Sequence, residues 1–317
     1  MGLFRSSRLK AFSKSLLRFP ADAFIRSSRA LPERIDIQLS KRIGSYLMEY
    51  PGISGKYYPY QAECASYVLF KPTNDRRTPP ESELPVPPSE LWLCSEGTSE
   101  DYLSSGREHV DKMMSIVRPS GVSLQRGHRV LDFGCGTGRM LRWLRNEADE
   151  CVIWGVDIQA QHIVWCQRHL SPPFRFATTT SLPHLPFEDG YFDFIYAGSV
   201  FTHIADLADA WLLELRRVLV PGGKLYITIQ DKHSIDIILK FPPSHQLHWL
   251  RRLLLSFEEE SDFMTSDFAM LTITRTPTGA SVFYDADSFC EQLKHSFKIL
   301  AVAEEAYWFQ TAILLEK

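Results

Sequence analysis

The sequence predicts an α/β protein in which helices and strands alternate along the chain and pack in layers. From about Ser99, segments with apolar residues three and four positions apart alternate with short apolar runs that are typical of buried strands. One of these runs, at 129–133, leads directly into a glycine-rich loop. With 317 residues, 44% of them hydrophobic and 23% charged, the chain can also bury the full core that such a domain needs.

The expected elements follow from these patterns in chain order. Runs rich in β-branched and aromatic residues predict strands at 129–133, 151–156, 174–177, 192–196, 224–229, 298–302 and 311–315. Helical spacing predicts helices at 102–117, 159–170, 207–218, 247–257 and 287–297, and another that begins near Arg139. Pro277 and Gly279 predict a hairpin between 269–274 and 280–284.

Residues 1–90 differ in character from the rest of the chain, and we assign 91–317 to the α/β domain. Residues 1–42 hold ten lysines and arginines against three acidic residues, a charge of +7, so the other 275 residues carry −10. Apolar residues at helical spacing between Leu9 and Phe19 predict a basic amphipathic helix there. This helix could pack on the domain, contact a membrane surface or a partner protein, or be an organellar transit peptide. The proline-rich segment 72–88 predicts an extended connector.

Composition and spacing argue against several kinds of site. The negative charge beyond residue 42 disfavours nucleic acid as a partner. The six cysteines are scattered singly, without a C-x-x-C pair, so we expect reduced thiols and a cytoplasmic protein. His245 and His248 lack a nearby carboxylate or cysteine partner, and no metal site is expected.

The segment 132–138 reads Asp-Phe-Gly-Cys-Gly-Thr-Gly and follows a predicted strand, which is typical of a nucleotide cradle. Its three glycines are Gly134, Gly136 and Gly138. A dinucleotide site needs a small residue where Arg139 stands, and the Asp132 carboxylate would repel a pyrophosphate. The loop therefore favours a nucleoside that carries an ammonium or sulfonium group.

Asp157 ends the next predicted strand, nineteen residues after Gly138. At that position a carboxylate can accept hydrogen bonds from both hydroxyl groups of a ribose. The alternative is that Asp157 caps the following helix, where aspartate is also favoured. Ile158, the next residue, would offer an apolar flank to an adenine ring.

Four motifs in order resemble the class I S-adenosylmethionine-dependent methyltransferases, in particular their type-11 and type-25 small-molecule group. Besides the glycine loop and Asp157, they are Leu-Pro-Phe-Glu-Asp-Gly-Tyr-Phe-Asp at 185–193 and Leu-Arg-Arg-Val-Leu-Val-Pro-Gly-Gly at 215–223. The resemblance implies a Rossmann-like, doubly wound sheet of seven strands with the last strand antiparallel. It also implies S-adenosylmethionine as the cofactor and S-adenosylhomocysteine as the product. The N-terminal helical extension and an insertion at 231–284, expected to form a C-terminal lid, lie outside it.

The resemblance also assigns roles to single residues. It places the three glycines against the methionine and ribose part of the cofactor, Asp132 near its ammonium group and Asp157 on its ribose. Where this group usually has an acidic residue for the adenine amino group, the chain has Ser181, preceded by Thr178, Thr179 and Thr180, and a hydroxyl would accept a weaker bond. The full set of cofactor-binding candidates is Asp132, Gly134, Gly136, Gly138, Asp157, Ile158, Thr180, Ser181 and Ser199.

Methyl transfer from a sulfonium is an in-line displacement, so the protein mainly aligns donor and acceptor. If the acceptor is a hydroxyl or ammonium group, a base must take its proton, and His203 is the leading candidate because it follows the fourth strand. His203 could equally cap the next helix, and Asp231 and His233 are second candidates.

These observations predict an enzyme that methylates an oxygen or nitrogen atom of a small molecule, with a hydrophobic acceptor among those that fit. Residues 197–200 lack the Asn/Asp-Pro-Pro-aromatic turn by which enzymes that methylate bases resemble one another. The alternative is a non-catalytic, methyltransferase-like module that binds the cofactor or a protein partner. A nicotinamide-dependent oxidoreductase is disfavoured by Arg139 and Asp132.

Overall fold

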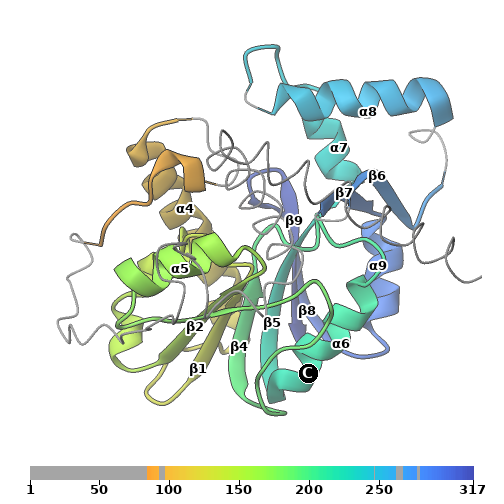
Figure 1. Cartoon of the computed structure of the whole chain (residues 1–317). Coiled ribbons are helices and arrows are strands. Elements are labelled where there is room, and N and C mark those ends of the chain that lie inside the picture. The colour runs from red at the N-terminus through yellow and green to blue at the C-terminus, as the bar shows by residue number, and fades with distance from the viewer. Residues whose placement is uncertain (1–83, 93–96, 246, 262–266, 277–278) are drawn as a thin grey trace, which may run out of the picture. The chain divides into compact units, whose positions relative to one another are not determined.

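The computed structural model describes residues 84–92, 97–245, 247–261, 267–276 and 279–317 (Figure 1). The strands are β1 (Arg129–Phe133), β2 (Val152–Asp157), β3 (Arg175–Thr178), β4 (Phe192–Ala197), β5 (Leu219–Asp231), β6 (Met270–Thr276), β7 (Gly279–Tyr284), β8 (Lys298–Tyr307) and β9 (Gln310–Glu316). The α-helices are α4 (Ser99–Val117), α5 (Ala160–His169), α6 (Ala208–Val218), α7 (Lys232–Ile238), α8 (His248–Ser261) and α9 (Ala286–Leu293). Among the described residues, no helix is both long and apolar enough to cross a membrane.

Two sequence predictions lie largely outside the described residues. These are the N-terminal amphipathic helix and most of the proline-rich connector. Close to the predicted boundary between residues 90 and 91, Leu84 is buried in the core of the domain, and its carbonyl accepts a hydrogen bond from Arg142. The boundary itself stays a prediction, although the packed core begins before it.

Seven strands form one continuous sheet in the order β3-β2-β1-β4-β5-β9-β8. The first five run parallel, and β9 lies antiparallel to both β5 and β8. The predicted doubly wound α/β fold with its antiparallel strand is therefore confirmed. The strand order reverses between β1 and β4. In sheets of this kind, ligands bind beyond the carboxyl ends of the strands at such a reversal.

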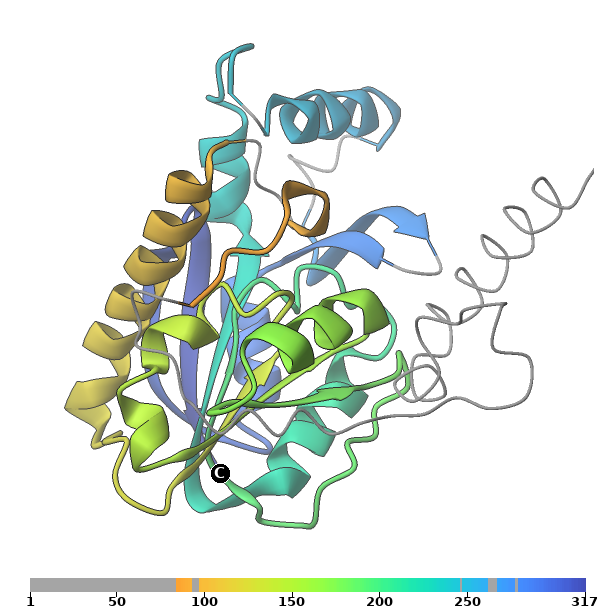
Figure 2. The same cartoon turned by 60° about the vertical axis from the view of Figure 1, so that its left-hand side comes forward.

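Helices cover both faces of the sheet because successive side chains of a strand point to opposite faces. In β4, Phe194 and Tyr196 belong to the core on the side of α4 and α5, whereas Ile195 and Ala197 belong to the core under α6 and α9. Figure 1 and Figure 2 show these two helical layers on either side of the strands. The sheet is therefore buried on both faces, and its carboxyl edge is the place where a ligand can reach it.

The prediction of a helix that begins near Arg139 is wrong. The structure has turns there, followed by two short 3₁₀ helices, Leu141–Leu144 and Glu147–Asp149. In this tighter winding, residues three apart lie on the same face. Leu141 and Leu144 use that spacing to enter the core together, both almost fully buried. Their spacing also suits an α-helix, so apolar periodicity does not separate the two windings.

The segment 231–284 contributes α7, α8 and the predicted β6–β7 hairpin beyond the carboxyl end of β5, and the hairpin is confirmed. Strand β7 runs parallel to the last residues of β5, so the hairpin extends the sheet locally. Helix α7 is absent from the predicted elements because seven residues are too few for a clear period. Ile238, Leu254 and Phe283 belong to an apolar cluster that packs these elements together. Their role as a lid stays a prediction.

Helix α4 packs directly on the glycine loop. The buried Tyr102 hydroxyl lies 2.8 Å from the Thr137 hydroxyl of the loop. One turn further on, a Cβ atom at Gly106 would overlap the backbone oxygen of Arg139. Glycine at this position therefore allows the helix axis to come as close to the loop as it does.

Replacing Gly106 with alanine should destabilise the protein, because the added methyl group forces α4 away from the loop. The higher helix propensity of alanine offsets this by at most about 1 kcal/mol. We expect the free energy of unfolding, measured by urea denaturation, to fall by about 1–3 kcal/mol. Glu108→Ala on the exposed face of the same helix is the control and should change it by less than about 0.5 kcal/mol. Equal stability of the two variants would contradict the close packing.

Candidate functional site

The glycine loop folds over the carboxyl ends of β1 and β2, at the point where the strand order reverses. The amides of Gly134 and Cys135 both donate hydrogen bonds to the Val156 carbonyl, at 2.8 and 3.0 Å. Gly134 has a φ of +82°, and a Cβ atom there would overlap the side chain of Val200, which follows β4. Only glycine fits this position, and the loop therefore presents bare backbone where the strand order reverses.

Asp157 joins the end of β2 to this loop. One carboxylate oxygen accepts a hydrogen bond from the Gly136 amide and the other from the Gln159 amide, both at 2.8 Å. The side chain is buried, and burial raises its pKa although these amides and the nearby His162 act in the opposite sense. Each carboxylate oxygen can accept a second bond, so the predicted contact with ribose and the local turn at Gln159 are compatible.

Asp132 lies on β1, in the middle of the sheet and two residues before the first glycine of the loop. It is 4% exposed. Burial raises its pKa to about 8, and the neighbouring Asp157 carboxylate adds to this rise. At neutral pH Asp132 is therefore mainly protonated, and a cation placed beside it would favour its ionised form.

The predicted adenine segment follows β3. Thr180 and Leu182 bond to each other, because the Thr180 hydroxyl donates to the Leu182 carbonyl and accepts from the Leu182 amide, both at 3.2 Å. Ser181 is exposed and Ile158 is half-buried. By contrast, the buried hydroxyls of Thr178 and Thr179 have no hydrogen-bond partner among the described residues. Because unpaired buried hydroxyls are costly, these two positions fit a polar ligand group, and the motif pattern did not single them out.

A second group that the sequence pattern did not single out surrounds Arg139, directly after the loop. Its guanidinium donates to the Ser105 hydroxyl at 3.2 Å and lies 3.0 Å from Nδ1 of His109, both on α4. It also bonds the Tyr307 hydroxyl, and its Cζ lies 5.6 Å from the centre of the Trp308 ring. Burial lowers the pKa of His109 to about 3, so this histidine is neutral beside the cation. The contacts span many residues in sequence, and spacing alone does not reveal them.

Ser199 and His203 lie in the connection after β4, at the same edge of the sheet. Ser199 adopts a left-handed conformation with a φ of +59°. His203 is exposed, and its Nδ1 lies 2.9 Å from the Ala280 carbonyl at the start of β7. Because a carbonyl only accepts, Nδ1 carries the proton in the neutral ring and Nε2 is left with its lone pair.

The second-rank candidates have partners of their own. The Asp231 carboxylate caps α7, where it accepts hydrogen bonds from the amide and the hydroxyl of Ser234, both at 2.9 Å. His233 Nε2 lies 3.1 Å from a Glu305 oxygen, and this hydrogen bond raises the pKa of His233. Both side chains thus hold α7 in place. Within the described residues, no group of His, Cys, Asp and Glu side chains could hold a metal ion.

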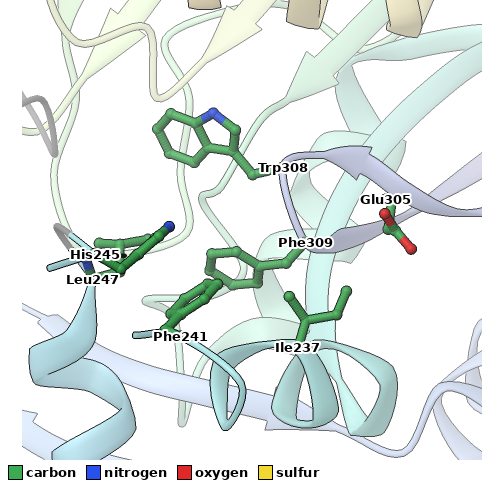
Figure 3. A pocket seen from close by; sticks show the side chains of 7 residues that line it. All are labelled: Ile237, Phe241, His245, Leu247, Glu305, Trp308 and Phe309. Carbon is green, nitrogen blue, oxygen red and sulfur yellow. Dashed lines mark hydrogen bonds between the residues drawn. The ribbon is translucent and has the colours of Figure 1, made fainter. Parts of the chain in front are cut away.

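A cavity of about 230 Å³ opens between α7, the α7–α8 connection and the β8–β9 turn (Figure 3). Phe241 stacks on His245 with ring centres 3.8 Å apart, and Phe309 meets Phe241 edge-on. The lining residues are Ile237, Phe241, His245, Leu247, Glu305, Trp308 and Phe309. Trp308 also contacts Arg139, so one wall of the cavity is continuous with the group behind the glycine loop.

Comparison with known proteins agrees with this geometry. A family model described as a methyltransferase domain matches residues 131–227. The ubiquinone/menaquinone biosynthesis C-methyltransferase UbiE of Cupriavidus pinatubonensis is 31% identical over 132 residues, which cover 40% of this chain and 52% of that protein. A demethylmenaquinone methyltransferase of Thermus thermophilus is 33% identical over 118 residues, which cover 36% of this chain and 48% of that protein. The chain spans about half the length of these curated relatives.

Among solved structures, an S-adenosylmethionine-dependent methyltransferase from Mesorhizobium loti is similar to 66% of this chain and to 100% of its own, at 15% identity and a TM-score of 0.45. The family match begins within β1 and ends within β5, so it contains the glycine loop, Asp157 and the connection after β4. Residues 131–227 thus match a methyltransferase domain, in agreement with the resemblance of their motifs to those of S-adenosylmethionine-dependent methyltransferases.

Proposed function

We propose that this protein is a methyltransferase that transfers the methyl group of S-adenosylmethionine to an oxygen or nitrogen atom of a small, largely apolar molecule and releases S-adenosylhomocysteine. When bound, the cofactor supplies an activated methyl group on a sulfonium. The observation that carries the proposal is the tie between the Asp157 carboxylate and the Gly136 amide, which holds a loop of bare backbone over the strand reversal.

Each cofactor-binding residue has a role that follows from its position. The ribose hydroxyls donate to Asp157, whose oxygens keep free lone pairs, and the ammonium group of the methionine part pairs with Asp132. The adenine ring lies along Ile158 and the segment after β3. Its polar edge meets the hydroxyls there, among which the buried and unpaired Thr179 is better placed than the exposed Ser181.

The cavity beside Trp308 is the proposed acceptor site. Five of its seven lining residues are aliphatic or aromatic without a charge, and none is a lysine or arginine. Its volume lies below the roughly 300–1,000 Å³ of sites for drug-sized ligands, so it suits an acceptor of one or two rings. The relative from Cupriavidus is named for ubiquinone and menaquinone biosynthesis, and a ring-shaped apolar acceptor would agree with that likeness.

His203 is the proposed general base. Its Nδ1 is tied to the Ala280 carbonyl, so Nε2 is the nitrogen that can accept a proton. Strand β7 also fixes the backbone around it, because the Val282 amide donates to the Thr202 carbonyl at 2.9 Å. The 231–284 segment would therefore position the base as well as wall the acceptor site.

Binding of S-adenosylmethionine should release a proton from Asp132. The carboxyl group has a pKa of about 8 in the free protein, and the ligand's ammonium group favours its ionised form. Near pH 7 we therefore expect up to about one proton per cofactor, measured by calorimetry in buffers of different ionisation enthalpy. Because binding is coupled to loss of this proton, affinity should increase between about pH 6 and pH 7.5.

The Asp132→Asn variant should bind without this proton release and with a flatter pH dependence. The matched control is Asp111→Asn on the exposed surface of α4, which should behave as the natural protein does. The same proton release from Asp132→Asn and the natural protein would place the ammonium group elsewhere.

Measurements of both turnover and cofactor binding test the role of His203. With a panel of small phenols and aromatic amines, the natural protein should form S-adenosylhomocysteine. His203→Gln should slow this turnover by about 10²–10⁴-fold without weakening cofactor binding. His295→Gln, an exposed histidine after α9, is the control. Unchanged turnover by His203→Gln would make this residue structural, and cofactor binding without turnover of any acceptor would favour a non-catalytic module.

A further inference from the structure

Three residues close a ring of hydrogen bonds at the carboxyl edge of the sheet, and a fourth, Thr202, is bonded to it through Ser199. The Thr228 hydroxyl on β5 donates to Oε1 of Gln310 on β9 at 2.7 Å, and the Gln310 amide nitrogen donates to the Ser199 hydroxyl at 2.8 Å. The Ser199 backbone amide donates to the Thr228 hydroxyl at 2.7 Å, and this bond closes the ring. The Ser199 hydroxyl also lies 3.2 Å from that of Thr202. Three neighbouring segments are thereby joined through Ser199.

The direction of every bond in the ring is fixed. Thr202 donates its proton to the Ser199 carbonyl at 3.0 Å, so the Ser199 hydroxyl is the donor toward Thr202. The Thr228 hydroxyl accepts a hydrogen bond from the Ser199 amide and donates its own proton to the Gln310 oxygen. The Gln310 amide nitrogen therefore faces Ser199. Thr202, Thr228 and Gln310 are at most 2% exposed. Because the partners of the half-buried Ser199 are buried and every proton is assigned, the ring favours one arrangement of Ser199.

Ser199 needs such support because of its backbone. Its φ of +59° is a left-handed conformation that residues with a Cβ atom adopt at a cost, and such strain persists only where surrounding contacts impose it. Both the amide and the hydroxyl of Ser199 are used in the ring. The ring therefore acts on the conformation of Ser199, and the hydroxyl keeps a single lone pair beyond these bonds.

The conformation of Ser199 matters to the cofactor site because the next residue, Val200, occupies the space that a side chain at Gly134 would fill. A change at Ser199 would move Val200 against the first glycine of the loop. Gln310 also begins β9 directly after the turn whose first residue, Tyr307, bonds Arg139 at the other end of the loop. One short turn thus reaches both sides of the loop.

We propose that Gln310 is a positioning residue, which, through Thr228, holds Ser199 in its left-handed conformation and so keeps the glycine loop in the shape that binds S-adenosylmethionine. This inference rests on the proposed function, since it concerns the same cofactor site. Gln310 itself does not need to touch the cofactor.

Two substitutions at Ser199 separate a role of the backbone from a role of the hydroxyl. Ser199→Ala removes the acceptor for Gln310 but keeps a Cβ atom, so the strained conformation loses support, and we expect cofactor affinity to fall about tenfold. Ser199→Gly removes the same hydroxyl, but glycine adopts a positive φ without strain, so affinity should stay within about threefold of the natural protein. Calorimetric titration with S-adenosylmethionine measures both. Equal losses in the two variants would overturn the proposal, because they would show that the hydroxyl itself binds the ligand.

Substitution of Gln310 tests the positioning residue directly. Gln310→Leu should weaken cofactor binding about tenfold, and adding Ser199→Gly to it should restore affinity to within about threefold of the natural protein. A residue that only stabilises the fold would not be rescued in this way. The control is Thr311→Val at the next position, whose buried hydroxyl has no hydrogen-bond partner among the described residues, and it should bind normally.

The outcomes separate this inference from the proposed function. If the natural protein does not bind S-adenosylmethionine, the proposed function fails. If the natural protein binds and Gln310→Leu, folded by circular dichroism, binds equally well, only the positioning role fails. If Gln310→Leu does not fold, the pair of Ser199 variants decides the matter, because neither removes a fully buried side chain.

Discussion

The hydrogen bond from the Gly136 amide to the Asp157 carboxylate is the contact on which the candidate site depends. It joins the loop after β1 to the end of β2, two strands that are already neighbours in the sheet. A hydrogen bond to a charged group contributes roughly 1.5–3 kcal/mol. The three glycines of the loop all have positive φ angles, and glycine alone imposes no single conformation. Asp157 supplies the constraint that the glycines lack, and it does so with oxygens that can still accept from a ribose.

Segments distant in sequence complete the site around this contact. Helix α4 covers the loop from one side, where Tyr102 meets Thr137. The turn between β8 and β9 contacts it from another, because Tyr307 bonds Arg139 and Gln310 bonds Ser199. The residues between them, Trp308 and Phe309, line the apolar cavity. One turn of the chain is thus shared by the cofactor loop and the proposed acceptor site, which gives a physical reason for the two to lie side by side.

The sequence predicted those parts of the fold that depend on local patterns. Strands β1, β2 and β4 are short apolar runs, and α6 has its apolar residues at helical spacing, so both periods were visible. The 3₁₀ winding after Arg139 could not be predicted from the sequence, because residues three apart share a face in both an α-helix and a 3₁₀ helix. Helix α7 depends on a cap and on packing rather than on periodicity, and seven residues are too few to show a period.

The same division applies to the site. The glycine loop and Asp157 stand close together in sequence and carry a recognisable spacing. Gln310 and Thr179 carry no such signal: one acts through contacts between strands distant in sequence, and the other is distinguished only by a buried hydroxyl without a described partner. Such residues become visible only when hydrogen bonds are counted in three dimensions.

The role of the Asp157 contact in cofactor binding can be measured by calorimetric titration of the natural protein and of Asp157→Ala with S-adenosylmethionine, with NADH as a comparison ligand. The natural protein should bind S-adenosylmethionine with micromolar affinity and should not bind NADH. Asp157→Ala should bind S-adenosylmethionine more weakly by about 1–3 kcal/mol, because the ribose hydroxyls and the Gly136 amide both lose their acceptor. Equal affinity in a folded Asp157→Ala variant, or binding of NADH in place of S-adenosylmethionine, would show that Asp157 does not hold the cofactor.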